Sequence, residues 1–249
     1  MILAIIQARM SSGRLKNKVL KKIENKEILK IIYQKIESIK EIDNVLIATS
    51  NHKSDNAIES FCIKNNFRLF RGSLNNVLDR FYKASLTSMP DHILRITADC
   101  PLIDSEVIKK IIKLHLKYNN NYTSNTIVPF FPDGMDAEIF DFNSLSKTFK
   151  LAKKKYEKEH VTPYIYENPK LFKLMNLKNK NNYSNYRITL DYRDDYTLIE
   201  KIIKKLNKLG IKNNLKNIIY VIDKYKLNKI NNKYIRNESF INDKKKKKT

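Results

Sequence analysis

Small and basic residues follow directly after the first apolar run of the sequence, in a pattern suited to phosphate binding. Residues 2–6 (ILAII) are uniformly apolar, and residues 7–20 read QARMSSGRLKNKVL. A strand that ends in such a loop leaves backbone N–H groups beside Arg9, Arg14 and Lys18, and these donors together suit a triphosphate. Neither GxxxxGK[ST] nor GxGxxG is present, which disfavours P-loop and dinucleotide-binding enzymes. The alternative is a basic, solvated loop without a ligand.

Two aspartates at the ends of later apolar runs are candidate ligands for a divalent metal ion. Asp99 ends the segment RITAD (95–99), and Asp191 ends the segment RITLD (187–191). A Mg²⁺ ion that bridges phosphate oxygens needs one or two such carboxylates rather than a complete cage of protein ligands. For Asp99, the alternative is a hydrogen bond to its own turn before Pro101.

A third charged segment lies between these aspartates. Residues 132–140 read PDGMDAEIF, and strand alternation puts Asp136 and Glu138 on the same side of a short strand. These carboxylates are candidate contacts for a second substrate, and the alternative is an exposed charged strand face. His160, in the charged turn KEHVTPYI (158–165), is a further candidate. A histidine at the start of a helix serves equally often as a cap or interface residue.

These candidate residues need elements that bring them together, and the apolar periodicity supplies such elements. Short apolar runs alternate with longer segments of helical period, which predicts βαβ units and a mostly parallel sheet. Open α/β sheets bind ligands at the carboxyl ends of their strands. The expected strands cover residues 2–6, 44–49, 67–70 and 92–97, and the expected helices cover residues 27–39, 54–65, 75–86 and 104–117.

Beyond residue 119 the pattern loosens, and fewer elements can be predicted. We expect a helix around 143–157, a strand at 186–190 and a helix at 195–209 that Gly210 closes as a C-terminal cap. The two acids that open the last helix, Asp194 and Asp195, are interpreted as N-terminal capping residues.

Length and the absence of linkers predict one domain over residues 1–235, followed by a basic, disordered tail at 236–249. Two cysteines, Cys62 and Cys100, provide neither a disulfide framework nor a zinc ribbon. The apolar N-terminal run is too short for a signal peptide or a membrane span, so we expect a cytoplasmic protein without membrane insertion.

The net charge of +23 raises the question of a nucleic-acid partner. Residues 201–249 hold 16 Lys/Arg and 3 Asp/Glu, so more than half of the excess lies in the last fifth of the chain. The other lysines are scattered, with few aromatic-basic clusters of the kind that stack bases. Charge alone indicates non-specific attraction. We therefore expect no specific nucleic-acid partner.

Six segments, in order and with similar spacing, resemble the cytidylyltransferase family, which contains the spore-coat polysaccharide protein SpsF and is related to CMP-KDO and CMP-sialic acid synthetases. Together they extend over residues 1–200. The segments are IIQARMSSGRLKNKVL (5–20), FRGSLNNVLDRFY (70–82), RITADCPLID (95–104), PDGMDAEIF (132–140), KEHVTPYI (158–165) and RITLDYRDD (187–195).

The resemblance implies an α/β fold, namely a Rossmann-like three-layer α/β/α sandwich of the nucleotide-diphospho-sugar transferase (GT-A-like) type with a mostly parallel mixed sheet. It implies a nucleotidyltransferase that uses CTP and Mg²⁺ to form a CMP-activated sugar or sugar-like acid for polysaccharide or glycoconjugate synthesis. An acceptor hydroxyl would attack the α-phosphorus of CTP in line, and pyrophosphate would leave. The implied partners are CTP, an anionic sugar-like acceptor and a second copy of the chain, with an inserted acceptor and dimerisation region at about 120–185.

The same resemblance implies roles for individual residues. Arg9, Arg14 and Lys18 would bind phosphates and, with Asp99, would be the catalytic residues; Asp99 and Asp191 would hold Mg²⁺. The implied nucleotide-binding residues are Gln7, Ala8, Arg9, Ser11, Ser12, Gly13, Arg14, Lys18, Arg71, Gly72, Ser73 and Arg95. The implied acceptor-binding residues are Asp133, Gly134, Asp136, Glu138, His160 and Arg187.

Three positions depart from the family pattern. The family usually has Pro-Gly where Lys16-Asn17 stand, Gly where Ala98 stands and Pro where Arg193 stands. We therefore expect the turn of the phosphate loop and the backbone after Asp191 to be the places where the structure departs most.

Two other functions account for part of the sequence. A metal-dependent glycosyltransferase of the same fold is one, but such enzymes generally use an Asp-x-Asp pair, and residues 99–101 read Asp-Cys-Pro. A basic, non-enzymatic RNA-binding protein would account for the charge of +23.

Overall fold

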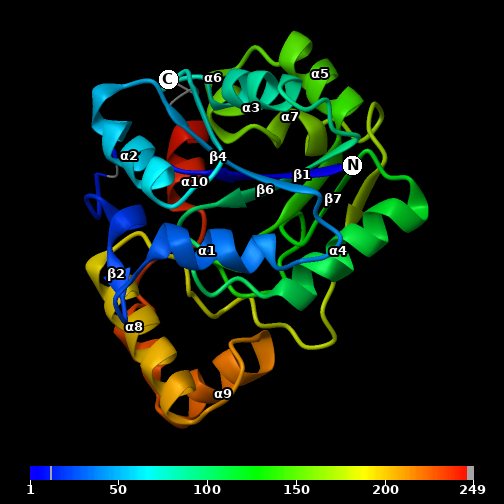
Figure 1. The fold of residues 1–249 in the computed structure, drawn as a ribbon. Coiled ribbons are helices and arrows are strands. Elements are labelled where there is room, and N and C mark those ends of the chain that lie inside the picture. The colour runs from blue at the N-terminus through cyan, green and yellow to red at the C-terminus, as the bar shows by residue number, and fades with distance from the viewer. Residues whose placement is uncertain (12, 246–249) are drawn as a thin grey trace.

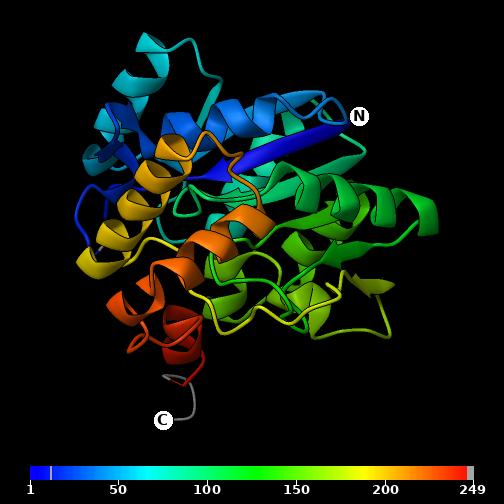
Figure 2. The ribbon, with the colours of Figure 1, turned by 90° about the horizontal axis from the view of Figure 1, so that it is seen from below.

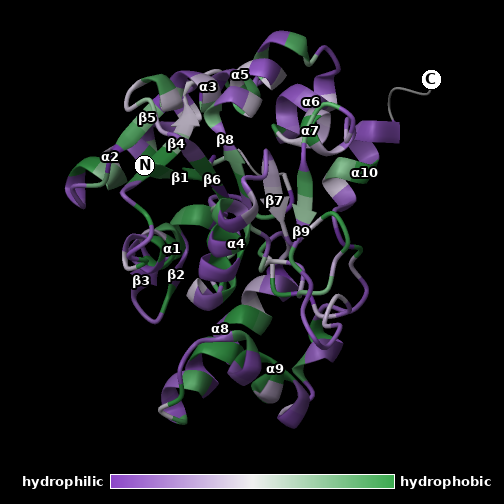
Figure 3. Cartoon of the chain, turned by 90° about the vertical axis from the view of Figure 1, so that its right-hand side faces the viewer, coloured by the Kyte–Doolittle hydropathy of each residue, from purple (hydrophilic) through white to green (hydrophobic). Residues whose placement is uncertain are grey.

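The computed structural model describes residues 1–11 and 13–245, and its centre is a seven-stranded mixed sheet with the order β5-β4-β1-β6-β8-β7-β9. β4 and β6 run parallel to β1, and β5 runs parallel to β4. β8 is antiparallel to both of its neighbours, β6 and β7. β1 is buried along most of its length and is coloured as hydrophobic in Figure 3, because both of its faces are covered. The strands are β1 (Ile2–Gln7), β4 (Asn44–Ser50), β5 (Leu69–Gly72), β6 (His92–Thr97), β7 (Tyr122–Ser124), β8 (Glu138–Asp141) and β9 (Leu174–Asn176).

Helices cover both faces of the sheet, which gives the three-layer α/β/α sandwich expected from the sequence (Figure 1). One face packs on α1 (Ile28–Glu37), α2 (Asn56–Lys64) and α4 (Ser105–Tyr118), and this core continues into α8 (Arg193–Lys208) and α9 (Leu215–Lys224). Figure 2 shows α8 and α9 together beyond that face. The other face packs on α3 (Val77–Leu86), α5 (Phe142–Leu151), α6 (Lys155–His160) and α7 (Pro163–Tyr166). A separate two-stranded ribbon joins β2 (Lys22–Ile23) to β3 (Lys26–Glu27).

The helix and strand predictions for the first 118 residues are confirmed within a few residues at each boundary. Near the C-terminus, Gly210 closes α8 as expected, with a φ of +62°. The N–H of Gly210 donates to Asn207 and the N–H of Ile211 donates to Leu206, which is the Schellman pattern.

The expected helix around 143–157 is instead two helices, α5 and α6. Ala152 adopts an extended conformation at the end of α5, and Lys154 is the N-cap of α6. The carboxylate of Glu157 accepts hydrogen bonds from the backbone N–H groups of Lys153 and Lys154. This local side-chain cap competes with a continuous helix and separates the two.

The prediction of a strand at 186–190 is wrong. In the described residues this segment is irregular, and Arg187 pairs with Asp133 in an isolated β-bridge. Gly134, at φ +100°, bends the partner segment after this single pair. The segment is still fixed: the N–H of Ile188 donates to Asp133 and the N–H of Leu190 donates to the carbonyl of Asp99. Asp191 therefore reaches the sheet edge at the end of an irregular segment.

The C-terminal tail, which was expected to be disordered, contains a helix in the part that the structure describes. Residues Glu238–Lys245 form helix α10, which contacts α6 (Figure 1), and residues 246–249 lie outside the described residues. In the described residues, no helix has the length and apolar character needed to cross a membrane.

A buried histidine of α4, His115, predicts that acid weakens the fold. His115 is fully buried, and its imidazole contacts His92 (3.1 Å) and Thr123 (3.2 Å). Burial, together with the neighbouring His92, lowers the pKa of His115 to about 4, whereas an unfolded chain has a histidine pKa near 6.5. Between these two pKa values the unfolded state binds more protons than the folded state. The contribution of neutral His115 to the free energy of unfolding is therefore complete above pH 6.5 and is lost as the pH falls towards 4.

Urea unfolding should therefore give a free energy of unfolding about 2 kcal/mol lower at pH 5 than at pH 6.5 from this group alone, at about 1.4 kcal/mol per unit. His115→Gln should remove this part of the pH dependence, whereas His52→Gln, at an exposed position, should keep it. An equal pH slope in the unchanged chain and His115→Gln would contradict the assignment.

Candidate active site

A cavity of about 660 Å³ opens at the carboxyl ends of β1 and β6 and contains most of the residues singled out in the sequence. This is the edge at which open α/β sheets bind ligands. Predicted site residues that line the cavity are Gln7, Arg9, Ser11, Gly13, Arg14, Lys18, Arg95, Asp99, Asp133, Asp136, Glu138, His160 and Asp191.

The loop after β1 is anchored by a buried acid that the sequence interpretation did not identify. One carboxylate oxygen of Asp55 accepts the backbone N–H of Met10 (2.8 Å), and the other accepts the N–H of Ser50 (3.1 Å). Burial opposes ionisation of Asp55, but these hydrogen bonds outweigh it and lower the pKa of the carboxyl group. The charged Asp55 therefore ties the start of the phosphate loop to the end of β4.

At the Lys16-Asn17 departure, Asn17 adopts a left-handed backbone conformation. Asn17 has φ 57° and ψ 24°, in the left-handed region, and precedes the short 3₁₀ turn Lys18–Leu20. Asparagine tolerates this conformation better than most non-glycine residues. Asn17 therefore supplies the positive φ that a glycine would otherwise provide, and Lys18 is directed inward by the turn.

Lys18 joins the two predicted metal-binding carboxylates. Its ammonium group donates to Asp99 (2.9 Å), to Asp191 (2.8 Å) and to the carbonyl of Leu190 (2.8 Å). Burial disfavours the charged lysine, but the two carboxylates outweigh burial and raise the pKa of Lys18. Burial likewise disfavours charged Asp99, but Lys18 holds the pKa of Asp99 well below its usual range. Lys18 and Asp99 are therefore both charged at neutral pH.

Arg14 adds a second cation at the same place. Its guanidinium lies 2.9 Å from the second oxygen of Asp191 and 3.9 Å from Glu238. Arg9 is the third loop cation and pairs with Glu159 (2.7 Å). All three cations predicted to bind phosphate thus face the cavity, each held by an acid.

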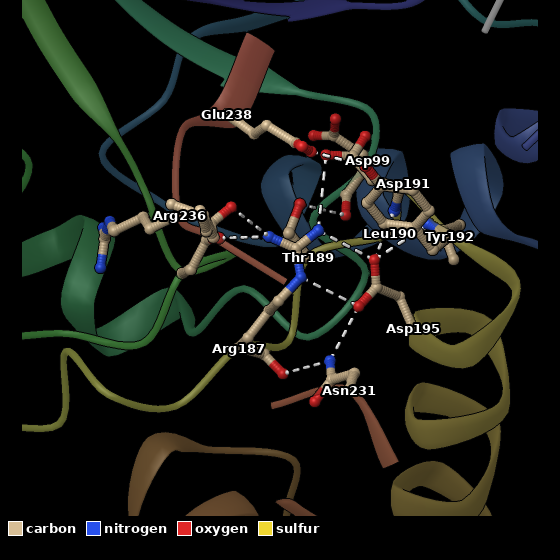
Figure 4. A network of polar contacts seen from close by, with 12 residues as sticks. Asp99, Arg187, Thr189, Leu190, Asp191, Tyr192, Asp195, Asn231, Arg236 and Glu238 are labelled. Atoms are coloured by element: carbon tan, nitrogen blue, oxygen red, sulfur yellow. Dashed lines mark hydrogen bonds and ion pairs between the residues drawn. The ribbon is translucent and has the colours of Figure 1, made fainter. Parts of the chain in front are cut away.

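Arg187 is part of the support for Asp191 (Figure 4). Its guanidinium donates to both oxygens of Asp195 (3.0 and 2.9 Å) and to Asp133 (2.8 Å). Asp195 also accepts the N–H groups of Asp191 and Tyr192, as the capping interpretation requires. Arg187, sequence-predicted as an acceptor-binding residue, is therefore committed to a buried network that fixes the backbone of Asp191.

The carboxylates on the acceptor side differ in how fully they are bonded. Glu138 accepts from Tyr122 (2.5 Å) and Thr162 (2.7 Å) with one oxygen and pairs with Arg95 through the other. Asp136 contacts Arg236 (2.6 Å) through one oxygen. Burial raises the pKa of Asp136, although Arg236 opposes this shift.

The donor set at the cavity floor fits Mg²⁺. In the described residues, no group of three or more His, Cys, Asp or Glu side chains has the arrangement of a metal site. However, Asp99 and Asp191 already share one cation, the Lys18 ammonium, with the carbonyl oxygen of Leu190 beside them. Hard oxygen donors of this number suit Mg²⁺, which takes its other ligands from phosphates and water.

The cytidylyltransferase family model matches residues 3–230. The chain belongs to the cytidylyltransferase family. It is 40% identical over 241 residues to an uncharacterized protein of Methanocaldococcus jannaschii, covering 96% of this chain and 97% of that protein. It is 36% identical to the spore coat polysaccharide biosynthesis protein SpsF of Bacillus subtilis, covering 82% of this chain and 87% of SpsF.

Solved structures agree with this membership. A cytidylyltransferase from Leptospira borgpetersenii has a TM-score of 0.86 and 33% identity, with 94% of this chain and 98% of that chain covered. A CMP:2-keto-3-deoxy-manno-octonic acid synthetase complexed with CTP shares the fold at a TM-score of 0.61 and 12% identity, with coverages of 82% and 98%. The chain is thus a nucleotidyltransferase with a Rossmann-like fold, as the sequence predicted.

Several predicted nucleotide contacts of this cytidylyltransferase lie outside the cavity lining. Ala8 is buried, and Arg71 pairs with Glu59 and donates to the carbonyl of Ser50. Ser73 accepts the N–H of Asn76, next to Gly72. Ser12 lies outside the described residues. The structure therefore brings together the residues predicted to bind phosphate, whereas residues 71–73, at the carboxyl end of the outermost strand β5, are not among the described residues that line the cavity.

Gly134 has a backbone role. A Cβ at this position would lie 2.3 Å from the backbone nitrogen of Thr189, and φ is +100°. Only glycine allows this close approach of the two segments. Gly134 therefore allows segment 133–137 to reach the segment that leads to Asp191.

Sequence interpretation missed several residues that line the cavity. Their signals were weak because threonines, a tyrosine and residues near the C-terminus carry no metal-binding or phosphate-binding pattern. Glu159 was within reach, since it precedes His160 in a segment already singled out. The missed lining residues include Thr97, Thr126, Glu159, Thr162, Tyr166, Thr189, Asn237, Glu238, Ser239 and Phe240.

Proposed function

We propose that this cytidylyltransferase uses CTP and Mg²⁺ to attach CMP to a hydroxyl group of a sugar or sugar-like acid, with release of pyrophosphate. The observation that carries the proposal is that Asp99 and Asp191, from distant segments, converge on one cation beside Arg14 at the floor of the cavity. The name of SpsF supports polysaccharide or glycoconjugate synthesis as the destination of the product. A 3-deoxy-manno-octulosonate cytidylyltransferase of Elusimicrobium minutum, 30% identical over 52% of this chain, supports an acidic sugar as acceptor.

The residues of the chain would act mainly by positioning and by charge stabilisation. Arg9, Arg14 and Lys18 would bind the triphosphate, exchanging their present carboxylate partners for phosphate oxygens. Asp99 and Asp191 would hold Mg²⁺, which when bound neutralises charge on phosphate oxygens. The acceptor hydroxyl would then attack the α-phosphorus from the side of Asp136 and His160, which line the same cavity.

Two further parts of the proposal rest on the family resemblance. We propose that the enzyme acts in the cytoplasm and as a homodimer. Sedimentation velocity of the purified chain would give twice the monomer mass of 29.4 kDa if the second part is correct.

Pyrophosphate release tests the proposed reaction. The purified chain is incubated with each of the four nucleoside triphosphates, with and without Mg²⁺, against a panel of acidic sugars that includes 3-deoxy-manno-octulosonate. We expect pyrophosphate with CTP and Mg²⁺ in the presence of one acceptor class, and no release without the metal. Silence with every nucleotide would contradict the proposal, and a sugar transferred from a nucleotide sugar would favour the glycosyltransferase alternative.

A further inference from the structure

The C-terminal segment beyond the family match contributes to the cavity. The family model ends at residue 230, yet residues 237–240 line the cavity. Arg236 fixes this segment by donating to Asp136 (2.6 Å) and to the carbonyl of Phe131 (2.8 Å). Glu238 accepts from Tyr192 (2.5 Å) at the other side. Residues outside the matched region therefore form one wall of the site.

Within this wall, α10 holds His160 by two contacts. A carboxylate oxygen of Asp243 lies 3.1 Å from Nε2 of His160. The ring of Phe240 packs edge-on against the imidazole, with 5.2 Å between ring centroids and an interplanar angle of 87°. His160 is the last residue of α6 and lines the cavity, so these contacts set the orientation of a side chain that faces the substrate space.

The contact with Asp243 also sets the tautomer of His160. A carboxylate only accepts hydrogen bonds, so Nε2 carries the hydrogen and Nδ1 of the neutral ring keeps a lone pair. In residues 1–11 and 13–245 the hydrogen-bonded partner of the imidazole is Asp243 at Nε2. Nδ1 is therefore available to accept a hydrogen bond.

The groups around His160 favour the neutral ring at neutral pH. Burial and the charge of Arg95 lower the pKa of His160, whereas Asp243 and Glu159 raise it, and the balance lies below the ordinary value. A neutral imidazole is the form that can accept a hydrogen bond from a hydroxyl group.

We infer that Asp243 is a positioning residue for the acceptor: it holds His160 so that Nδ1 accepts a hydrogen bond from a hydroxyl group of the sugar-like substrate. The inference rests on the proposed function for the identity of the ligand. Helix α10, in the segment predicted to be a disordered tail, would thereby take part in selection of the acceptor.

Asp243→Ala tests the inference, with Lys244→Ala as the matched control on the same helix. Lys244 pairs with Glu167 (2.8 Å) and is not among the described residues that line the cavity. Lys244→Ala therefore tests whether weaker docking of α10 alone is sufficient to change the properties of His160. The imidazole signals of the full chain are followed by NMR against pH, and His160→Gln identifies His160 among the four histidines. Asp243→Ala should lower the pKa of His160, because the carboxylate is lost, and should abolish the single Nε2–H tautomer, because no acceptor remains at Nε2. Lys244→Ala should leave both unchanged.

The kinetic readout uses CTP, Mg²⁺ and the best acceptor from the pyrophosphate assay, beginning with 3-deoxy-manno-octulosonate. Asp243→Ala should raise the acceptor KM about tenfold, the value of one hydrogen bond, and leave the KM for CTP within about twofold. An unchanged tautomer and acceptor KM in Asp243→Ala, or equal effects in Lys244→Ala, would overturn the inference. Absence of turnover in the unaltered chain would instead refute the proposed function. The two failures are distinguishable, because the NMR titration tests the contact between Asp243 and His160 without any substrate.

Discussion

Asp99→Asn is expected to lower the rate of CMP transfer about 10³-fold while the protein stays folded. The substitution keeps the shape of the side chain but removes one of the two charges that would hold Mg²⁺ over the phosphates. Lys18 keeps Asp191 and the carbonyl of Leu190 as partners, so the cavity floor does not lose its cation. Pyrophosphate release and the thermal unfolding midpoint are measured on the same preparation.

Asp194→Asn is the matched control for this prediction. Asp194 lies three residues beyond Asp191, but its carboxylate pairs with Lys233 and Tyr234 away from the cavity lining. This variant should transfer CMP at the rate of the unaltered chain. An active Asp99→Asn enzyme, or equal losses in the two variants, would remove Asp99 from the metal site.

Lys18→Met is expected to destabilise the protein without Mg²⁺ and to abolish productive binding of the triphosphate. The side chain of Lys18 is 11% exposed, and its ammonium group separates two carboxylates. Loss of this group therefore leaves Asp99 and Asp191 facing each other without that cation. Breaking a buried ion pair in this way costs about 3–5 kcal/mol. Because Mg²⁺ would restore a cation between the carboxylates, it should raise the unfolding midpoint of Lys18→Met far more than that of the unaltered chain.

Lys16→Met removes a lysine from the same loop at an exposed position and serves as the control. Its stability and its response to Mg²⁺ should match those of the unaltered chain. If Mg²⁺ shifts the unfolding midpoint of Lys18→Met no more than that of Lys16→Met, then Asp99 and Asp191 do not form the metal site.

The sequence was sufficient for the parts of this fold that local patterns determine. The first four parallel strands and their helices follow from apolar periodicity, and Asp99 follows from its place at the end of β6. The positions that depart from the family were also interpretable. Arg193 is the first residue of α8, where the family's proline is favoured but not required, so the helix begins without it.

Other features depended on contacts between distant segments, and local patterns could not reveal them. The pairing of Arg187 with Asp133 and Asp195 is one such feature, since these residues lie 54 and 8 positions away from it in the sequence. The wall formed by α10 depends on Arg236 reaching Asp136, 100 residues earlier in the sequence. A basic C-terminal sequence gives no local sign of such docking.

Identification of the product by mass spectrometry tests directly whether the enzyme transfers CMP from CTP to an acidic sugar. CTP, Mg²⁺, the purified chain and an acidic sugar that supports pyrophosphate release are incubated together, and the nucleotide products are separated. We expect one new compound with the mass of the acceptor plus CMP less water, formed in equal amount to pyrophosphate and absent with Asp99→Asn. CTP that remains intact with every acceptor, or that yields CDP and orthophosphate in place of a CMP-linked sugar, would contradict it.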